Sequence, residues 1–109
     1  MDLHRLAEER SLAYHRVIAE RLRTQPEILE KARERVRTWS AASESAGRFY
    51  ARKWAEILAG DIPSIASFLT QRSELAVELR QSTPFAGALR PQERWRIWRE
   101  TRERFSATP

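Results

Sequence analysis

Apolar side chains recur every three or four positions along most of the chain, and no stretch alternates apolar and polar residues as a half-buried strand would. Only three of the 109 residues are glycine, so little interrupts this periodicity. The pattern therefore predicts an all-α protein, a single compact domain of five or six helices. The expected helical segments are residues 3–23, 26–39, 48–59, 61–79 with a kink near residues 72–73, and a last helix from residue 91 onward.

The first two expected helices are separated by the short break Thr24-Gln25-Pro26-Glu27. A capping threonine, a proline in the first turn and a glutamate three residues after the threonine are typical of a helix start. Because so short a connection reverses the chain, we expect an N-terminal helical hairpin.

The rest of the chain is divided by two segments that lack helical periodicity. One is a small, polar run that predicts flexibility, and the other is an uncharged loop, residues 81–89. Gly60 and Asp61 mark a helix end and the next helix start. We therefore expect one helical domain, residues 1–109, in four parts: a hairpin at 1–40, a flexible linker at 41–47, central helices at 48–81, and a loop plus C-terminal helix at 82–109.

Charge changes this picture little. The chain carries 20 basic and 15 acidic residues, a net charge of +5, and its excess lies in residues 82–109, with six arginines against three glutamates. Proteins that bind phosphate backbones usually show a clearer one-sided excess. No apolar run approaches the roughly 18 residues of a membrane span, and no apolar block follows the N-terminus. We expect a cytoplasmic protein without membrane contact.

Residues for catalysis are scarce. There is no cysteine and no glycine-rich phosphate loop, and the only histidines are His4 and His15. These two share a helical face with Glu8 but are about 16 Å apart at the standard helical rise, too far for one metal ion. Both are expected to be solvated or partly packed. The sequence predicts no enzyme activity, no cofactor and no metal site.

One alternative is a helix-turn-helix regulator that binds promoter DNA. Ala55, Ala59, Ile65 and Phe68 match the spacing of small and apolar anchor positions in that motif, although ordinary core packing explains them as well. The second helix would offer the groove Ser64, Ser67, Thr70, Gln71 and Arg72.

The C-terminal segment holds the strongest interaction signal. Trp95 and Trp98 share one stripe of the last helix, and Arg99 and Arg102 follow them at four-residue spacing, so each guanidinium can lie over an indole. Tryptophan and arginine are enriched at binding hot spots. The other interpretation is that the two tryptophans close the core of a small protein. The uncharged loop is long for a compact helical domain, and long connections are often functional.

Two motifs in this segment carry a family resemblance. Thr83-Pro84-Phe85-Ala86-Gly87 and Arg94-Trp95-Arg96-Ile97-Trp98-Arg99-Glu100 resemble the C-terminal signature of small helical bacterial proteins treated as antitoxins. These are encoded beside larger genes, notably those of nucleotidyltransferase-type toxins. The N-terminal run from Leu3 to His15 is also similar to such proteins. The resemblance covers both ends of the chain, and it implies a cognate toxin as partner and no catalytic residues.

We therefore expect an antitoxin that binds and neutralises its toxin. Pro84 and Phe85 would seat in an apolar groove of the toxin, and the last helix would be anchored by its tryptophans while its arginines pair with acidic groups. The predicted partner-binding residues are Pro84, Phe85, Arg94, Trp95, Arg96, Trp98, Arg99 and Arg102. A further alternative is a non-catalytic adaptor that self-associates through the N-terminal hairpin.

Overall fold

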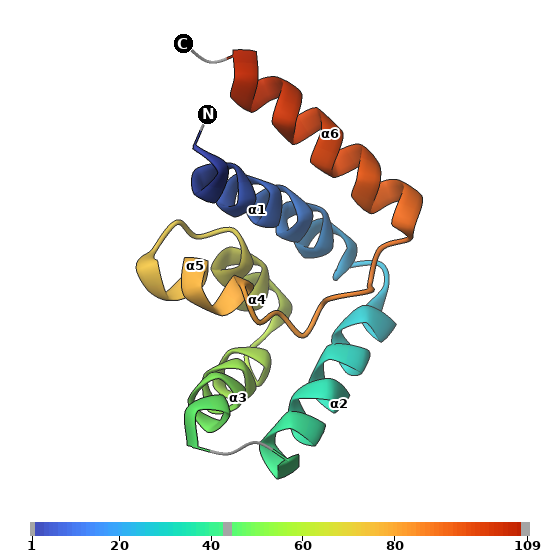
Figure 1. Cartoon of the computed structure of the whole chain (residues 1–109). Helices are drawn as coiled ribbons and strands as arrows, with labels where there is room; N and C mark the ends of the chain where they lie inside the picture. The colour runs from blue at the N-terminus through green and yellow to red at the C-terminus, as the bar shows by residue number, and fades with distance from the viewer. Residues whose placement is uncertain (1, 43–44, 108–109) are drawn as a thin grey trace.

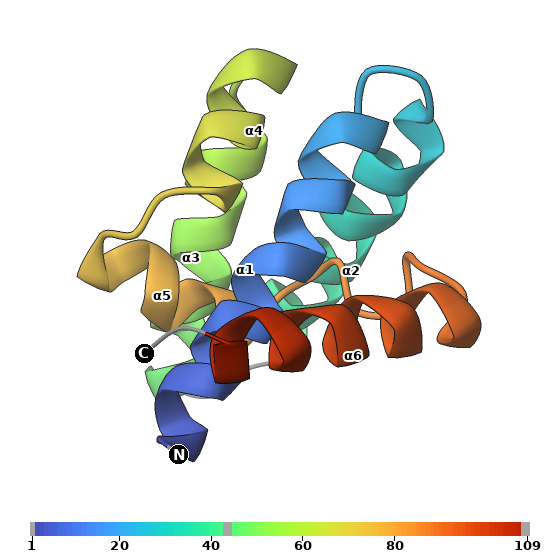
Figure 2. The same ribbon diagram turned by 90° about the horizontal axis from the view of Figure 1, so that it is seen from above.

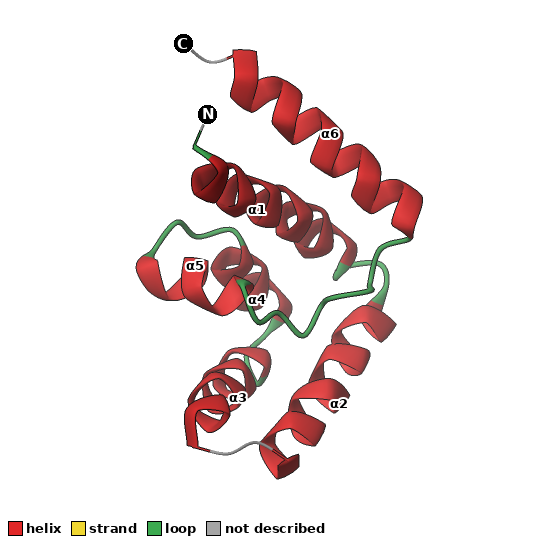
Figure 3. Ribbon diagram, in the orientation of Figure 1, coloured by secondary structure: helices red, strands yellow, loops and turns green. Residues whose placement is uncertain are grey.

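The computed structural model describes residues 2–42 and 45–107, and all regular secondary structure in these ranges is helical (Figure 1 and Figure 3). The all-α prediction is confirmed. No helix in these ranges is both long enough and apolar enough to cross a bilayer. The helices in chain order are α1 (Leu3–Arg21), α2 (Pro26–Ala42), α3 (Ser45–Leu58), α4 (Ile62–Leu69), α5 (Glu74–Arg80) and α6 (Pro91–Ala107).

Short polar side chains start three of these helices. Asp2, Asp61 and Ser73 each accept a hydrogen bond from the backbone N–H three residues further on, at distances of 3.1, 2.8 and 3.2 Å. The kink predicted near residues 72–73 is a full break, because α4 ends at Leu69 and Ser73 caps a separate helix. The sequence pattern therefore predicted the helical segment and a kink within it, but not that the segment divides into two helices.

The flexible linker predicted at residues 41–47 is wrong in extent. α2 continues through Ala42 and α3 begins at Ser45, while residues 43–44 lie outside the described part. Alanine is the best helix former, and α2 and α3 pack on each other. The described residues Ala41, Ala42 and Gly47 are helical but exposed, so local helix propensity rather than burial carries the helices into a run that by composition resembles a linker.

The core forms around Trp54 of α3, whose side chain is fully buried. Its indole N–H donates to the Leu79 carbonyl at 3.2 Å, so its one polar group is satisfied. Its ring meets Phe68 and Phe85 edge to face, with centroid distances of 5.9 and 6.2 Å. The buried residues around it come from α1 to α5 and the loop before α6. α6 adds only Ile97 to the edge of this cluster.

The loop before α6 is part of the core, which corrects the sequence-based expectation. Phe85 is 1% exposed and Pro84 is also buried, so neither projects toward solvent. The Tyr14 hydroxyl donates to the Phe85 carbonyl at 2.6 Å, which ties the loop to α1. Burial explains why this loop carries no charge. Phe85 fills part of the core, and charged residues beside it on the same segment would be costly to bury.

A second set of contacts fixes the outer half of this loop. Arg35 of α2 donates to the carbonyls of Pro84 and Ala86 at 3.3 and 2.6 Å. Gly87 has φ +82°, a conformation that side chains with a Cβ rarely adopt. The loop is thus held from α1 on one side and from α2 on the other.

α6 lies outside the bundle and packs on α1 (Figure 2). It runs in the opposite sense: Arg21 at the end of α1 forms an ion pair with Glu93 at the start of α6, and Arg5 lies 5.9 Å from the ring of Phe105. The chain termini consequently lie at the same end of the molecule (Figure 1). This placement leaves most of the surface of α6 open.

Candidate partner-binding surface

The outer surface of α6 displays two tryptophans. Trp95 is 62% exposed and Trp98 is 40% exposed, while the central Trp54 is fully buried. Five arginines of the same helix are also exposed, and four of them belong to the predicted contact set. We call this set the α6 face: Arg94, Trp95, Arg96, Trp98, Arg99 and Arg102. The structure therefore places six of the eight predicted partner-binding residues on one exposed helix, and buries the other two, Pro84 and Phe85.

The buried side of α6 differs from the stripe predicted by its aromatics. Thr101 is buried and Ile97 is half-buried, and both lie against the bundle. The Thr101 hydroxyl donates to the Ile97 carbonyl at 2.7 Å, so a polar side chain is accommodated there at little cost. With this side turned inward, Trp95 faces solvent and Trp98 lies at the flank.

A cation covers Trp98, but it comes from another helix than predicted. The Arg10 guanidinium of α1 lies 5.1 Å from the Trp98 ring centroid. Such a contact holds the ring against α1 and contributes about 0.5–1 kcal/mol at an exposed site. The expected stacking of Arg99 on Trp95 and of Arg102 on Trp98 is not among the cation–π contacts of the described residues.

The α6 face is positively charged. Within the described part of the chain, none of its four arginines forms an ion pair, and Glu93 is already occupied by Arg21. The Arg21 guanidinium holds the pKa of Glu93 below its usual value, so that carboxylate stays ionised and engaged. The free cations beside exposed indoles form a surface suited to an acidic and apolar partner.

A pocket of about 290 Å³ lies beside Trp98, between α6, α1 and the loop before α6. Apolar walls come from Trp98 and from the Ala86–Gly87 segment, and arginines from three elements reach it. We call it the Trp98 pocket. Its lining residues are Ala7, Arg10, Ser11, Tyr14, His15, Arg80, Thr83, Ala86, Gly87, Arg94 and Trp98.

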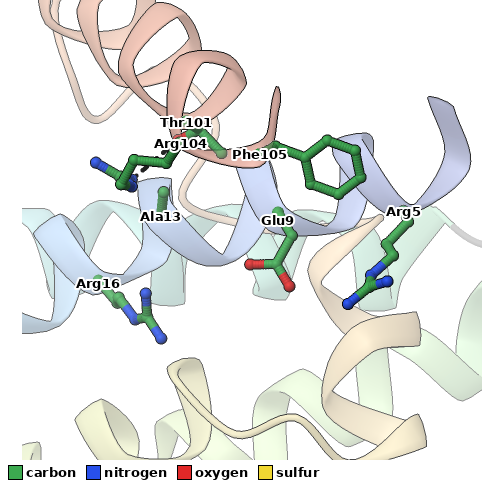
Figure 4. A pocket seen from close by; sticks show the side chains of 7 residues that line it. All are labelled: Arg5, Glu9, Ala13, Arg16, Thr101, Arg104 and Phe105. Atoms are coloured by element: carbon green, nitrogen blue, oxygen red, sulfur yellow. Dashed lines mark hydrogen bonds between the residues drawn. The ribbon is translucent and has the colours of Figure 1, made fainter. Parts of the chain in front are cut away.

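A second pocket of about 350 Å³ opens at the other side of the α1–α6 contact (Figure 4). Arg5, Arg16 and Arg104 surround Glu9, and Phe105 closes one end. The Glu9 carboxylate accepts hydrogen bonds from Arg72 at 2.6 and 3.4 Å, which lower its pKa. Its negative charge makes this pocket mixed in sign, unlike the Trp98 pocket.

A chain of hydrogen bonds under the Trp98 pocket involves His15, which is buried rather than solvated or partly packed as predicted. Its Nδ1–H donates to the Ser11 carbonyl at 2.7 Å, and its Nε2 accepts from the Thr83 hydroxyl at 2.8 Å. The Thr83 oxygen in turn accepts the Phe85 N–H at 3.1 Å. Burial lowers the pKa of His15 to about 4, which keeps the ring neutral near pH 7.

The other histidine, His4, lies far from this chain. It is exposed and contacts Glu8 at 3.1 Å. In the described ranges, no group of three or more His, Cys, Asp or Glu side chains is placed to hold a metal ion.

The residues proposed for DNA contact are spread over α4 and the turn after it. Ser64, Ser67, Gln71 and Arg72 are exposed and Thr70 is half-buried. Arg72 is engaged by Glu9 across the molecule.

The packing of a helix-turn-helix unit is incomplete at its predicted anchors. Ile65 is buried and Phe68 half-buried, but Ala55 and Ala59 are exposed. A recognition helix is normally fixed by burying such positions against the preceding helix. The arrangement of α3 and α4 therefore gives the DNA-binding alternative little geometric support.

No family model, no curated protein and no solved structure gives a significant match to this chain. The resemblance to antitoxins consequently stays a prediction, and functional arguments depend on the surface itself.

Sequence reasoning missed the residues that pair with Trp98. Arg10 gave a signal, because it is the one charged residue on the inward stripe of the first predicted helix. Ala86 and Gly87 gave none beyond their place in an uncharged loop. Their role depends on contacts with α1 across some 70 residues of chain, as the Tyr14–Phe85 hydrogen bond illustrates.

Proposed function

We propose that this protein is an antitoxin that binds a cognate toxin, of the nucleotidyltransferase type implied by the resemblance, and neutralises it by protein–protein contact. The observation that carries this proposal is the exposure of Trp95 and Trp98 on a helix outside the core. Large rigid aromatics beside arginines are the residue types most enriched at binding hot spots. A partner that covers them removes apolar surface from water.

Charge supports an acidic partner surface. The four arginines of the α6 face lack ion pairs in the described ranges, so they are available to carboxylates. Complementary charges chiefly set orientation and raise the association rate. The metal-binding carboxylates of a nucleotidyltransferase-like site have this chemistry, and a helix that covers them would obstruct the active site.

The loop before α6 has a supporting part in this proposal. Phe85 anchors the loop in the core and so fixes the base from which α6 departs. A rigid base lowers the entropy cost of presenting the tryptophans to a partner. Pro84 and Phe85 are therefore not contact residues in the proposed complex.

The proposal is tested by affinity capture of the tagged full chain from its native cells, with quantitative mass spectrometry of what binds. We expect one protein in near-stoichiometric amount. Expressed alone in a bacterial host, that protein should arrest growth, and co-expression with this chain should restore it. Recovery of the chain alone, or with nucleic acid, would contradict the proposal, as would a partner that leaves growth unchanged.

Two matched variants locate the contact. Trp95→Ala removes an exposed aromatic from the α6 face, and Phe49→Ala removes one that is 45% exposed on α3. Loss of a hot-spot tryptophan costs about 2 kcal/mol or more, so we expect roughly 30-fold weaker binding for Trp95→Ala. Phe49→Ala should change affinity by less than about 3-fold. Equal effects of the two variants would remove α6 as the contact surface.

A further inference from the structure

The Trp98 pocket combines apolar walls with a basic rim. Trp98 forms one wall, the Ala86–Gly87 segment forms another, and Tyr14 and His15 contribute from α1. At about 290 Å³ the pocket lies at the lower limit of the roughly 300–1,000 Å³ sites that enclose drug-sized ligands. It has room for one large apolar side chain.

Charge in this pocket has one sign. Arg10, Arg80 and Arg94 line it, and none of its eleven lining residues is acidic. Glu8 and Glu9 do not line this pocket, but both act electrostatically on Arg80 from outside it. Arg80 already donates to the carbonyls that end α4, whereas Arg94 is exposed and has no ion pair in the described part of the chain.

Arg10 supplies the second observation. Its Nε is buried and has no hydrogen-bond partner among the described residues, and its guanidinium lies over the Trp98 ring. No carboxylate from the described chain neutralises Arg10, so the pocket is electrostatically complementary to an anion brought from outside.

We propose that the Trp98 pocket binds a partner segment in which an Asp or Glu adjoins a large apolar residue. The apolar side chain enters between Trp98 and the Ala86–Gly87 wall, and the carboxylate pairs with Arg94 and Arg10. This proposal rests on the proposed function, since it supplies the toxin's contribution to the contact. It reverses the role expected for the loop, which forms the wall of a receiving pocket instead of inserting into the partner.

The wall of this pocket is organised before binding. Tyr14 and His15 of α1 and Arg35 of α2 hold the loop through hydrogen bonds with Phe85, Thr83 and Ala86. A Cβ built on Gly87 would meet nothing within 4 Å, so the wall is open at this point. A fixed, open cavity loses little entropy when an occupant enters.

The first test uses the isolated full chain and small probes, so it does not depend on a partner. We would titrate 3-phenylpropionate, its neutral amide and inorganic phosphate, and follow the indole N–H of Trp98 and the amide of Gly87 by NMR. We expect saturable shifts at both groups for the carboxylate, with a dissociation constant in the millimolar range typical of so small a ligand. The amide should bind about 5-fold more weakly, because it cannot form the charged pair.

A pair of arginine variants controls for overall charge. Arg94→Gln and Arg99→Gln remove the same charge from two exposed positions of α6, but only Arg94 lines the pocket. Arg94→Gln should weaken the carboxylate about 5-fold, and Arg99→Gln less than about 2-fold. Absence of shifts at Trp98 and Gly87, equal binding of acid and amide, or equal effects of the two variants would overturn the proposal. Phosphate that displaces the carboxylate without need of the phenyl ring would also overturn it.

The captured partner then separates this proposal from the proposed function. If the toxin binds and Arg94→Gln weakens it while the probe result holds, both are supported. If the toxin binds Arg94→Gln as tightly as the wild type, the pocket proposal fails and the antitoxin proposal stands. If the probe binds as expected but no toxin is captured, the antitoxin proposal fails, and with it the assignment of the occupant to a toxin.

Discussion

The role of Phe85 can be tested by its replacement with alanine. Phe85 is 1% exposed and contacts the rings of Trp54 and His15 at centroid distances of 6.2 and 6.4 Å. Removal of a buried phenylalanine side chain costs about 3–5 kcal/mol, as lost burial plus the cavity left behind. We expect Phe85→Ala to lower the free energy of unfolding by that amount.

Urea denaturation followed by circular dichroism measures this change. In a chain of about this length, 1 kcal/mol corresponds to about 4–8 °C in melting temperature, so thermal unfolding of Phe85→Ala should occur roughly 12–40 °C lower. Trp95→Ala is the control, because an exposed aromatic outside the core should cost less than about 0.5 kcal/mol. A loss below about 1 kcal/mol for Phe85→Ala, with an unchanged denaturant slope, would refute the conclusion that the loop is a core element.

Three further predictions concern the same region. The pKa of His15 is about 4 in the folded chain against 6.5 for a free histidine, so the unfolded chain binds the proton more strongly. The free energy of unfolding is therefore highest above pH 6.5 and falls as the pH drops below it. Between pH 7.5 and 5.5 we expect a loss of about 1 kcal/mol in urea titrations, abolished by His15→Gln and retained by His4→Gln. Gly87→Ala forces a Cβ onto φ +82° and should cost about 1–2 kcal/mol in the same assay, although the space around it is open. Arg80→Leu leaves two backbone carbonyls without their donor and should lower the free energy of unfolding by about 1–3 kcal/mol. Arg72→Ala removes an exposed ion pair and should lower it by less than about 1 kcal/mol. Equal losses for the two arginines would contradict the structural role of Arg80.

Local signals in the sequence predicted the helices well. Asp61 and Pro91 mark helix starts through chemistry that acts within one turn, and both starts are confirmed. The linker at residues 41–47 was wrong in extent, because Ala41, Ala42 and Gly47 are helical although they are exposed. Packing between helices is not encoded in a local window.

The candidate site was predicted in part for the same reason. The exposed face of α6 was anticipated from Trp95 and its arginines, but the orientation of the helix was not. Threonine is only weakly apolar, yet Thr101 is buried, and its hydroxyl is satisfied there by the Ile97 carbonyl of the preceding turn. The burial of Phe85 depends on Tyr14, which is 71 residues away. Such contacts can be recognised only once the helices are placed.

The position of the two kinds of tryptophan bears on function. Trp54 and Phe85 complete a core that draws its buried residues from α1 to α5 and the loop, without any from α6. The tryptophans of α6 are therefore not needed to fill that core, and the alternative that they close it does not apply to Trp95 at 62% exposure. Burial of an indole would stabilise the protein by about 25 cal/mol per Å² of apolar surface, and an exposed indole does not contribute this free energy. In the proposed complex the toxin would cover these two exposed indoles and the neighbouring arginines, which form no ion pair in the described part of the chain.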